Sequence, residues 1–418
     1  MAILQKHRDF AEALKIANVR LFIGSAGFFT LSSRALAVVI GFQIYRITHN
    51  PMALGWLGLI EAIPALSLVL FGGYVADHFN RQKILLITGA ASFFCAVALA
   101  VLSWQHHAHS LLGLYTVIFF AGIARGFSDP AATAFEAQVV PKYLAVNAAS
   151  WVSSTWITCS MVGPAVIGFV FEARGAAGSY LLIAAGFALS WICIFRIPAQ
   201  AQPMPEKREP VLKSIWLGWR FVFKNQALLG AMALDLFAVL FGGAIALLPI
   251  YAEDILHVGA RGLGFLNAAP ALGALVITLL ATQHPPIKHA GRNLLLAVAG
   301  FGLCILLFAV SKHFWLSMVA LVFSGAFDGI SVVIRRSMVR LLSPDQLRGR
   351  IAAASWVFIC ASNELGAFES GFVASLIGTI PCVVLGGLTT LGIVALTAAF
   401  APQLRKLRFD PHTLEQHG

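Results

Sequence analysis

The sequence is organised as a series of long apolar runs separated by short polar segments. The runs at 52–76 and 84–104 are each long enough to cross a hydrocarbon layer of about 30 Å as a helix. A soluble domain has about a quarter of its residues charged, whereas only 11% of these 418 residues are charged and the mean hydropathy is +0.83. The pattern therefore predicts an all-α protein that crosses a membrane many times.

Twelve runs are long and apolar enough to be transmembrane spans. We place them at 21–45, 52–76, 84–104, 111–135, 147–171, 178–196, 226–251, 262–283, 293–311, 314–334, 350–375 and 381–402. The polar segment 198–213 has four prolines and mixed charges without hydrophobic periodicity, as is typical of a linker. We therefore expect two six-helix bundles, at 1–197 and at 226–418 with a short cytoplasmic tail. A cytoplasmic linker and an interfacial helix at 198–225 would join them.

Basic residues are distributed unevenly between the two sides that these spans define. Most of the 29 Lys and Arg residues fall on the side of both termini, and four fall in loops on the other side: Arg46, Arg174, Arg261 and Lys312. Because cytoplasmic loops are enriched in Lys and Arg, we expect both termini in the cytoplasm. The net charge of +11 is then a consequence of membrane topology, and we expect no nucleic-acid partner.

Two charged residues lie deep in the first two spans. Arg34 is about 20 Å from the inner end of the first span, and Glu61 is about 14 Å from the outer end of the second. Charged groups at this depth are costly and usually face a water-filled cavity or a partner. The two side chains could pair, either to order two helices or as part of a substrate or proton site.

Acidic residues also lie within the spans of the second half. Asp235 is about 14 Å from the inner surface, near the middle of the bilayer. We expect it to be an isolated acid that can take up a proton. Asp328 lies in the tenth span and Glu364 in the eleventh. Glu369, about 29 Å along its helix, is expected near the outer surface.

One short charged loop, GGYVADHFNRQK, joins the second and third spans. Gly73, Asp77 and Arg81 are spaced at i, i+4 and i+8. This spacing resembles the loop between spans two and three of the major facilitator superfamily, whose pattern is roughly G-x-x-x-D-R-x-G-R-R/K. The match is incomplete, because His78 replaces an arginine and Asn80 a glycine. The alternative is a solvated turn that only fixes topology.

The resemblance implies that this loop holds the two halves together on the inner side. Asp129, at the inner end of the fourth span, would pair with Arg81. Asp77 would face the positive N-terminal end of the eleventh span, near Arg350. The superfamily often has an arginine deeper in the fourth span, but Arg125 is not in that register, and we assign it no such role.

The fifth span contains a second resemblance. Gly163, Pro164 and Gly168 in SMVGPAVIG are similar to the antiporter pattern G-x-x-x-G-P-x-x-G-G, from which Ile167 departs. A Gly-Pro pair kinks a helix and permits close packing, as a transporter needs where its halves meet. Ordinary helix packing explains the same residues.

The two halves also resemble each other. His289 and Arg292 repeat His78 and Arg81 at an offset of 211, although the second loop lacks the acid. A repeat of two six-span halves is typical of this superfamily, with the substrate bound between the halves near the midplane.

Three further segments narrow the resemblance: DLFAVLFGGAIALLPIYAEDIL, SPDQLRGRIAA and ASNELGAFESG. They are similar to the branch of the superfamily that contains the bacterial enterobactin exporter and related drug exporters. The resemblance implies a monomeric, proton-coupled exporter of siderophore-like or amphipathic drug-like molecules in the bacterial inner membrane, working by alternating access. The alternative is a uniporter or importer of a small metabolite or a metal-linked solute in the same fold.

Site residues follow from the same resemblance. The first, fourth, seventh and tenth spans usually line the cavity in this fold, which implies that Arg34, Asp235 and Asp328 face the substrate. Asp235 is the first candidate for proton coupling, and Glu61 and Glu364 are further candidates. The sequence has no phosphate-binding glycine loop, no H-E-x-x-H motif and no nucleophile elbow, so we expect neither an enzyme nor a metal or cofactor.

Overall fold

The computed structural model describes residues 12–104, 111–199, 219–283, 288–344 and 348–409, and all the regular structure in these residues is helical. The elements are α1 (Glu12–Lys15), α2 (Ala17–Thr48), α3 (Pro51–His78), α4 (Arg81–Trp104), α5 (Leu111–Val139), η1 (Lys142–Leu144), α6 (Ala145–Phe195), α8 (Gln226–Phe241), η2 (Ala244–Leu247), α9 (Leu248–Ile250), η3 (Tyr251–Ile255), α10 (Gly259–Gln283), α11 (Ala290–Val310), α12 (Phe314–Leu342), α13 (Arg348–Ile377), α14 (Thr379–Phe400) and α15 (Pro402–Arg405).

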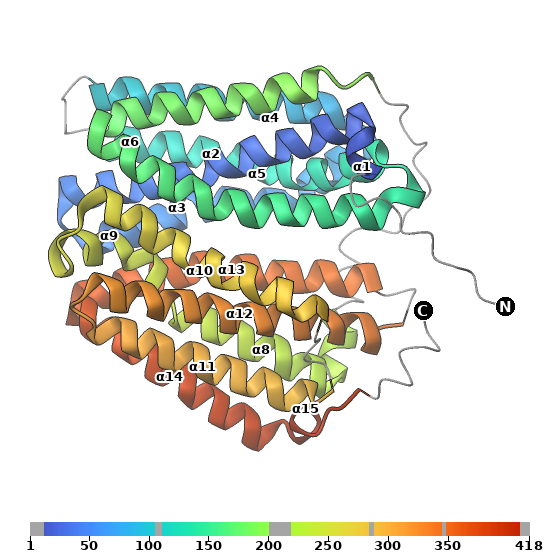
Figure 1. Cartoon of the computed structure of the whole chain (residues 1–418), viewed down its shortest axis with the longest axis vertical. Coiled ribbons are helices and arrows are strands. Elements are labelled where there is room, and N and C mark those ends of the chain that lie inside the picture. The colour runs from blue at the N-terminus through green and yellow to red at the C-terminus, as the bar shows by residue number, and fades with distance from the viewer. Residues whose placement is uncertain (1–11, 105–110, 200–218, 284–287, 345–347, 410–418) are drawn as a thin grey trace.

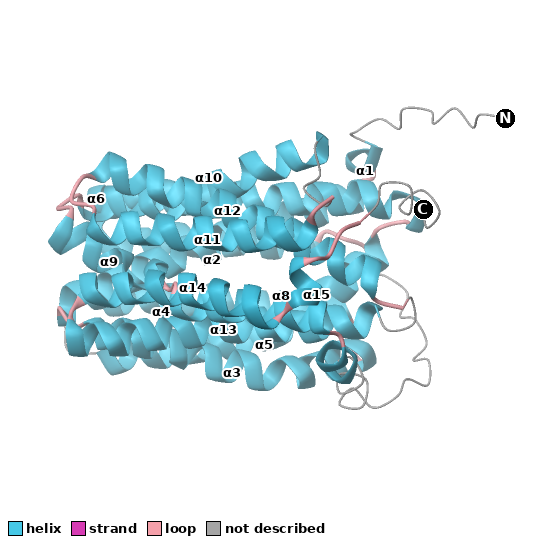
Figure 2. Ribbon diagram, turned by 90° about the horizontal axis from the view of Figure 1, so that it is seen from below, coloured by secondary structure: helices cyan, strands magenta, loops and turns pink. Residues whose placement is uncertain are grey.

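The long helices run side by side along one direction, as two perpendicular views show (Figures 1 and 2). Helices α2 to α6 form one side of the molecule and α8 to α15 the other; we call these the N-terminal half and the C-terminal half. The short helices α1 and α15 lie at one end, and α9 lies toward the opposite end, which we call the α9 end (Figure 1).

Ten of the described helices are long and apolar enough to cross a membrane. One of them, α6, consists of two helical segments that meet at Gly175, whose φ of 67° lies in the left-handed region that glycine tolerates. Helix α13, the expected eleventh span, has 30 residues. The expected all-α, multi-pass membrane protein is confirmed, and the count of twelve spans stays a prediction. Most of the expected linker lies outside the described residues.

The turn between α2 and α3 is fixed by local capping. His49 ends α2 in the left-handed conformation (φ 46°), and its N–H donates to the Tyr45 carbonyl. The Asn50 side chain accepts a hydrogen bond from the Met52 N–H, and Pro51 occupies the first position of α3. These interactions set the geometry with which the first two long helices meet at the α9 end.

The expected span 226–251 corresponds to one apolar segment, Gln226–Ile255, that is not a single regular helix. Helix α8 ends at Phe241, and the chain continues through η2, α9 and the π-helical η3. At the break, α13 approaches closely: a Cβ atom on Gly243 would lie 2.5 Å from the Ser370 Oγ and 3.1 Å from the Gly366 carbonyl oxygen. The expected span is retained as one apolar segment, Gln226–Ile255, although its helix is interrupted. The missing side chain of Gly243 allows α13 to pack closely at the interruption.

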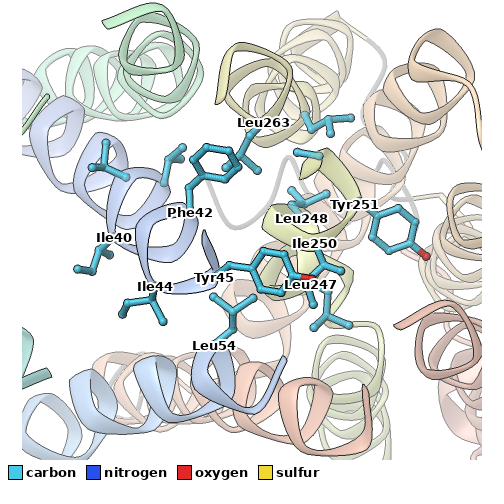
Figure 3. Close-up of a cluster of buried hydrophobic side chains, with 14 of the residues drawn as sticks. Ile40, Phe42, Ile44, Tyr45, Leu54, Leu247, Leu248, Ile250, Tyr251 and Leu263 are labelled. Carbon is cyan, nitrogen blue, oxygen red and sulfur yellow. The ribbon is translucent and has the colours of Figure 1, made fainter. Parts of the chain in front are cut away.

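An apolar core joins the two halves near the α9 end (Figure 3). Phe42 of α2 and Leu54 of α3 belong to the same buried cluster as Leu248, Tyr251 and Leu263 of the C-terminal half. Each of these side chains is at most 4% exposed. Close packing of these side chains stabilises the contact between the two halves.

Candidate functional site

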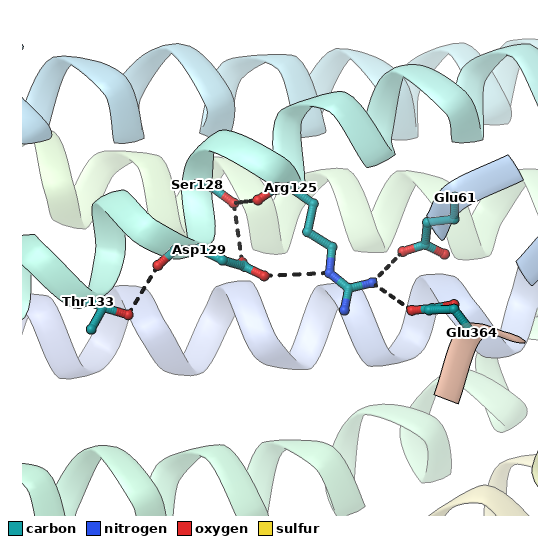
Figure 4. Close-up of polar contacts among 6 residues, drawn as sticks. All are labelled: Glu61, Arg125, Ser128, Asp129, Thr133 and Glu364. Carbon is teal, nitrogen blue, oxygen red and sulfur yellow. Dashed lines mark hydrogen bonds and ion pairs between the residues drawn. The ribbon is translucent and has the colours of Figure 1, made fainter. Parts of the chain in front are cut away.

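Arg125, in the middle of α5, connects three carboxylates (Figure 4). Its Nη1 lies 2.9 Å from Glu61 Oε1 on α3 and 3.3 Å from Glu364 Oε1 on α13. Its Nε lies 3.6 Å from Asp129 Oδ2, one turn further along α5. We call these four residues the Arg125 cluster. Because Glu61 and Glu364 belong to different halves, one guanidinium group links the two halves.

Close packing of α3 against α5 brings Glu61 within reach of Arg125. A Cβ atom on Gly122 would lie 2.5 Å from the Glu61 carbonyl oxygen, and one on Gly126 would lie 3.2 Å from the Ala65 carbonyl oxygen. Small residues at these positions allow the two helix backbones to approach. The glycines that flank Arg125 along α5 therefore position the ion pair.

The possible pair between Arg34 and Glu61 is not formed, because Glu61 pairs with Arg125. The Arg34 guanidinium instead lies 5.3 Å from the ring centroid of Trp156 on α6, in a cation–π contact. Arg34 is exposed although it lies in the middle of α2. It interacts electrostatically with Glu61, Glu364 and also Asp129. Arg34 therefore lies at the edge of the Arg125 cluster without an ion pair in the described part of the chain.

Arg125 is the residue that the sequence interpretation missed. It was set aside because its register differs from the superfamily pattern, yet an arginine inside an apolar span is itself a signal of function. Asp129, one turn further along α5, was a second signal, because residues four apart lie on the same face of a helix.

The expected pair between Arg81 and Asp129 is wrong. Arg81 donates from Nε to the Ala76 carbonyl (3.1 Å) and from Nη1 to the Ala134 carbonyl (3.3 Å). Its Nη2 lies 3.9 Å from Asp77 Oδ1. Asp129 precedes Ala134 by more than one turn, so it lies deeper in α5 and pairs with Arg125. Arg81 thus ties the α3–α4 turn to the backbone of α5.

Two other parts of the expected inner contact have different outcomes. A Cβ atom on Gly73 would have no atom within 4 Å, so close packing does not require a glycine there. The side chain of Arg350, near which Asp77 was expected to lie, is outside the described residues. The contact between Asp77 and α13 stays a prediction.

Asp235 is buried, as expected, but it is not isolated. It is ion-paired with Arg335 of α12, in the same half, and Arg335 Nη2 also lies 4.0 Å from Asp328 Oδ1. Arg335 further donates from Nε to the Ser331 Oγ at 3.2 Å. The Asp235 side chain is 9% exposed and that of Asp328 47%. We call Asp235, Asp328 and Arg335 the Arg335 cluster. The prediction of a lone acid was wrong because its partner lies on another helix.

Gly163, Pro164 and Gly168 lie at helix contacts. A Cβ atom on Gly163 would lie 2.7 Å from the Leu31 carbonyl oxygen of α2. One on Gly168 would lie 2.7 Å from the Ala260 carbonyl oxygen of α10. A Cβ atom on Gly264 of α10 would collide with the Pro164 carbonyl oxygen. This part of α6 thus packs against both its own half and the other half.

Polar contacts also cross between the halves at the α9 end. Arg46 Nε lies 3.3 Å from Glu253 Oε1, and Arg261 Nε lies 3.5 Å from Glu172 Oε2. The Tyr45 hydroxyl donates to the Asp254 carboxylate. We call the two arginine–glutamate contacts the α9-end ion pairs. Together with the apolar core, they hold the halves in contact at this end.

Comparison with curated proteins finds relatives of similar length. The enterobactin exporter EntS of Escherichia coli O1:K1 is 25% identical over 376 residues, which cover 90% of this chain and 90% of that protein. EntS of Escherichia coli O6:K15:H31 is 24% identical over 383 residues, covering 92% of this chain and 91% of that protein.

Solved structures share the fold at low sequence identity. A POT family transporter in complex with 5-aminolevulinic acid matches with a TM-score of 0.74 and 12% identity, covering 93% of this chain and 96% of that chain. A bacterial homologue of the human lysosomal transporter Spinster, inward-facing and unoccupied, matches with a TM-score of 0.72 and 13% identity, covering 95% and 99%.

The family model described as Major Facilitator Superfamily matches residues 22–367. This range includes α3, α5, α8 and α12, and the acids and arginines of both clusters. The match confirms the resemblance expected from the loop and span patterns. The chain therefore belongs to the Major Facilitator Superfamily and is a multi-pass membrane transport protein.

Proposed function

We propose that this protein is a proton-coupled exporter of siderophore-like or amphipathic drug-like small molecules, working by alternating access. The observation that carries the proposal is the shared guanidinium of Arg125, which pairs with Glu61 of the N-terminal half and Glu364 of the C-terminal half. A proton on Glu364 removes one of the two charges that hold Arg125 between the halves. Proton binding and separation of the halves are then linked through the same atoms.

The Arg125 cluster has properties that suit this role. The side chains of Glu61 and Glu364 are 34% and 20% exposed, so protons can reach both. Asp235 is more deeply buried, and its arginine belongs to its own half, so neutralising it breaks no described contact between the halves. We therefore place Glu364 and Glu61 before Asp235 as the acids that couple proton binding to movement.

The direction of transport and the membrane orientation are part of the same proposal. The curated relatives are named as exporters, and the distribution of Lys and Arg favours cytoplasmic termini in a bacterial inner membrane. In this orientation the α9 end faces outward, and its apolar core and ion pairs close the outer side. Gly73, Asp77 and Arg81 would stabilise the opposite state by closing the inner side.

Substrate recognition is assigned to the exposed charges between the halves. Arg34 is exposed, has no ion pair in the described residues and is held over the Trp156 ring. An arginine in this setting attracts an anionic or zwitterionic group, and the indole offers a flat apolar surface. Asp328, half-exposed on α12, would contact a cationic group of the substrate.

The test is transport in inside-out membrane vesicles with enterobactin as the first probe and the cationic dye ethidium as the second. We expect accumulation that requires a pH gradient and is abolished when the gradient is collapsed. Glu364→Gln should abolish gradient-driven accumulation while the amount of folded protein stays unchanged. Glu172→Gln, which changes an exposed acid of an α9-end ion pair, serves as the matched control and should retain most of the activity.

Two outcomes would contradict the proposal. Uptake that is indifferent to the pH gradient would indicate a uniporter or an importer of a small metabolite. Full gradient-driven activity in Glu364→Gln and in Glu61→Gln would remove the Arg125 cluster from the coupling mechanism.

A further inference from the structure

The Arg335 cluster has one more carboxylate than it has cations. Among the described residues, the charged groups that act on Asp235 are Arg335 and Asp328. The charged group that acts on Asp328 is Arg335. Helices α11, α13, α14 and α15 also pack against α8, and in the described part of the chain they contribute no charged group to Asp235. With both acids ionised, the cluster therefore carries one uncompensated negative charge.

An uncompensated charge at this position is energetically costly. Asp235 is buried within a helix long and apolar enough to cross the membrane. A buried ion pair is tolerated when its charges balance, whereas a surplus charge in the hydrocarbon region is expensive. One proton, bound by either carboxylate, restores neutrality while Arg335 keeps its contact with the other. The composition of the cluster thus favours one bound proton.

The structure also provides a route for that proton. Asp328 is half-exposed, whereas Asp235 lies behind it. The two acids line one small cavity with room for about a single water molecule, together with Ser331 and the apolar residues Phe301 and Phe327. A proton can bind at Asp328 and reach Asp235 through one intervening water. Asp328 lies fourteen residues after the first residue of α12, and Arg125 lies fourteen residues after the first residue of α5. The proton route in the C-terminal half therefore begins as far along its helix as Arg125 lies along α5.

Among the described residues, no ion pair joins the Arg335 cluster to the Arg125 cluster. The charged groups that act on Glu364 are Glu61, Arg125 and Arg34, and Arg335 is not among them in the described residues. The two arginines Arg34 and Arg125 face the three acids of the Arg125 cluster, which again leaves one carboxylate in excess. The Arg335 cluster, and the Arg125 cluster counted together with Arg34, therefore each have one carboxylate more than they have cations.

We propose that the Arg335 cluster is a second proton-binding site, so that each transport cycle moves two protons: one through Asp235 and Asp328 and one through the Arg125 cluster. The count of two protons in each transport cycle rests on the proposed proton-coupled export. The proton-binding site itself can be tested without measuring transport. A proton taken from water on the outer side would bind a carboxylate of the Arg335 cluster and return to water on the inner side.

The experiment is infrared difference spectroscopy of the purified full-length protein, between mildly acidic and mildly alkaline buffer, in the carbonyl stretching region of protonated carboxylic acids. We expect Asp235→Asn and Asp328→Asn each to remove the same component. The double variant should lose no more than either single variant, because each substitution alone balances Arg335. Glu364→Gln should remove a different component. Glu172→Gln is the control for an exposed acid and should leave both components in place.

The outcomes separate the second site from the proposed function. The second site is overturned if Asp235→Asn and Asp328→Asn leave the spectrum unchanged in folded protein, or if they remove two distinct components. Size-exclusion chromatography identifies a variant that fails to fold, and the other single variant then carries the test. Loss of the shared component together with transport that ignores the pH gradient would retain the proton site and reject proton-coupled export.

Discussion

At the scale of single residues, the geometry of one guanidinium group decides how the site is built. Arg125 uses Nη1 for Glu61 and Glu364 and Nε for Asp129, so it contacts acids from three helices at once. A planar group with several fixed donors can do this, whereas a lysine ammonium presents a single point of charge. The link between the halves therefore depends on arginine and not on positive charge alone.

Arg125→Lys should accordingly impair transport although it preserves the charge. Loss of a charge-assisted hydrogen bond costs about 1.5–3 kcal/mol, which corresponds to about a 10- to 160-fold change in an equilibrium. We expect gradient-driven accumulation of enterobactin in inside-out vesicles to fall by about this factor. Arg174→Lys is the matched control, because Arg174 is exposed beside the Gly175 turn. Equal activity of the two variants would contradict the role assigned to the guanidinium.

At the scale of helices, contacts between α3 and α13 depend on small residues. A Cβ atom on Gly371 would lie 2.6 Å from the Gly55 Cα and 2.9 Å from the Pro51 carbonyl oxygen. A Cβ on Gly58 would lie 2.9 Å from the Ala367 Cβ. Since the obstacles at Gly371 are backbone atoms, side-chain movement cannot make room there. The α9 end is closed because these two helices can touch.

Gly371→Ala should therefore open the α9 end. The added methyl group would push α13 away from α3 and expose the apolar core between the halves. In a background without the six native cysteines, a cysteine at position 54, where Leu54 is 4% exposed, should react faster with a membrane-impermeant maleimide. Gly392→Ala is the control, because a Cβ atom there has no neighbour within 4 Å. Unchanged labelling in Gly371→Ala would show that this contact does not hold the end closed.

At the scale of the whole molecule, movement between the halves requires the α9-end ion pairs to break. Exposed pairs contribute only about 0.2–1 kcal/mol each. The pairs Arg46–Glu253 and Arg261–Glu172 can therefore fix how the halves meet without preventing separation. The apolar core adds adhesion at this end through the close packing of its large side chains.

A cross-link at this end should stop transport. Cysteines at positions 172 and 261, joined by a short reducible cross-linker, should abolish accumulation, and reduction should restore it. Cysteines at 43 and 103 are the matched control: Gln43 and Ser103 are hydrogen-bonded within the N-terminal half at 2.9 Å, so joining them should leave transport intact. Full activity of the 172–261 cross-linked protein would contradict separation of the halves at the α9 end.

The sequence predicted the positions of the helices better than the contacts among them. Apolar length identified the span at 226–251, but it could not show that the helix is interrupted after Phe241, because the interruption depends on packing against α13. The loop pattern correctly indicated the superfamily, yet it assigned Asp129 to Arg81, because a pattern along the chain does not measure depth in a neighbouring helix.

The sequence by itself determined that this chain crosses the membrane and belongs to its superfamily. Backbone hydrogen bonds in lipid must be satisfied within each apolar segment, so helix formation there is a local property that the sequence encodes directly. Only the tertiary structure decided which buried charges meet. Arg125 pairs with Glu61, 64 residues away, and with Glu364, 239 residues away. Such partners are selected by the packing of helices, since a buried charge is stable only where the folded chain brings its counter-charge.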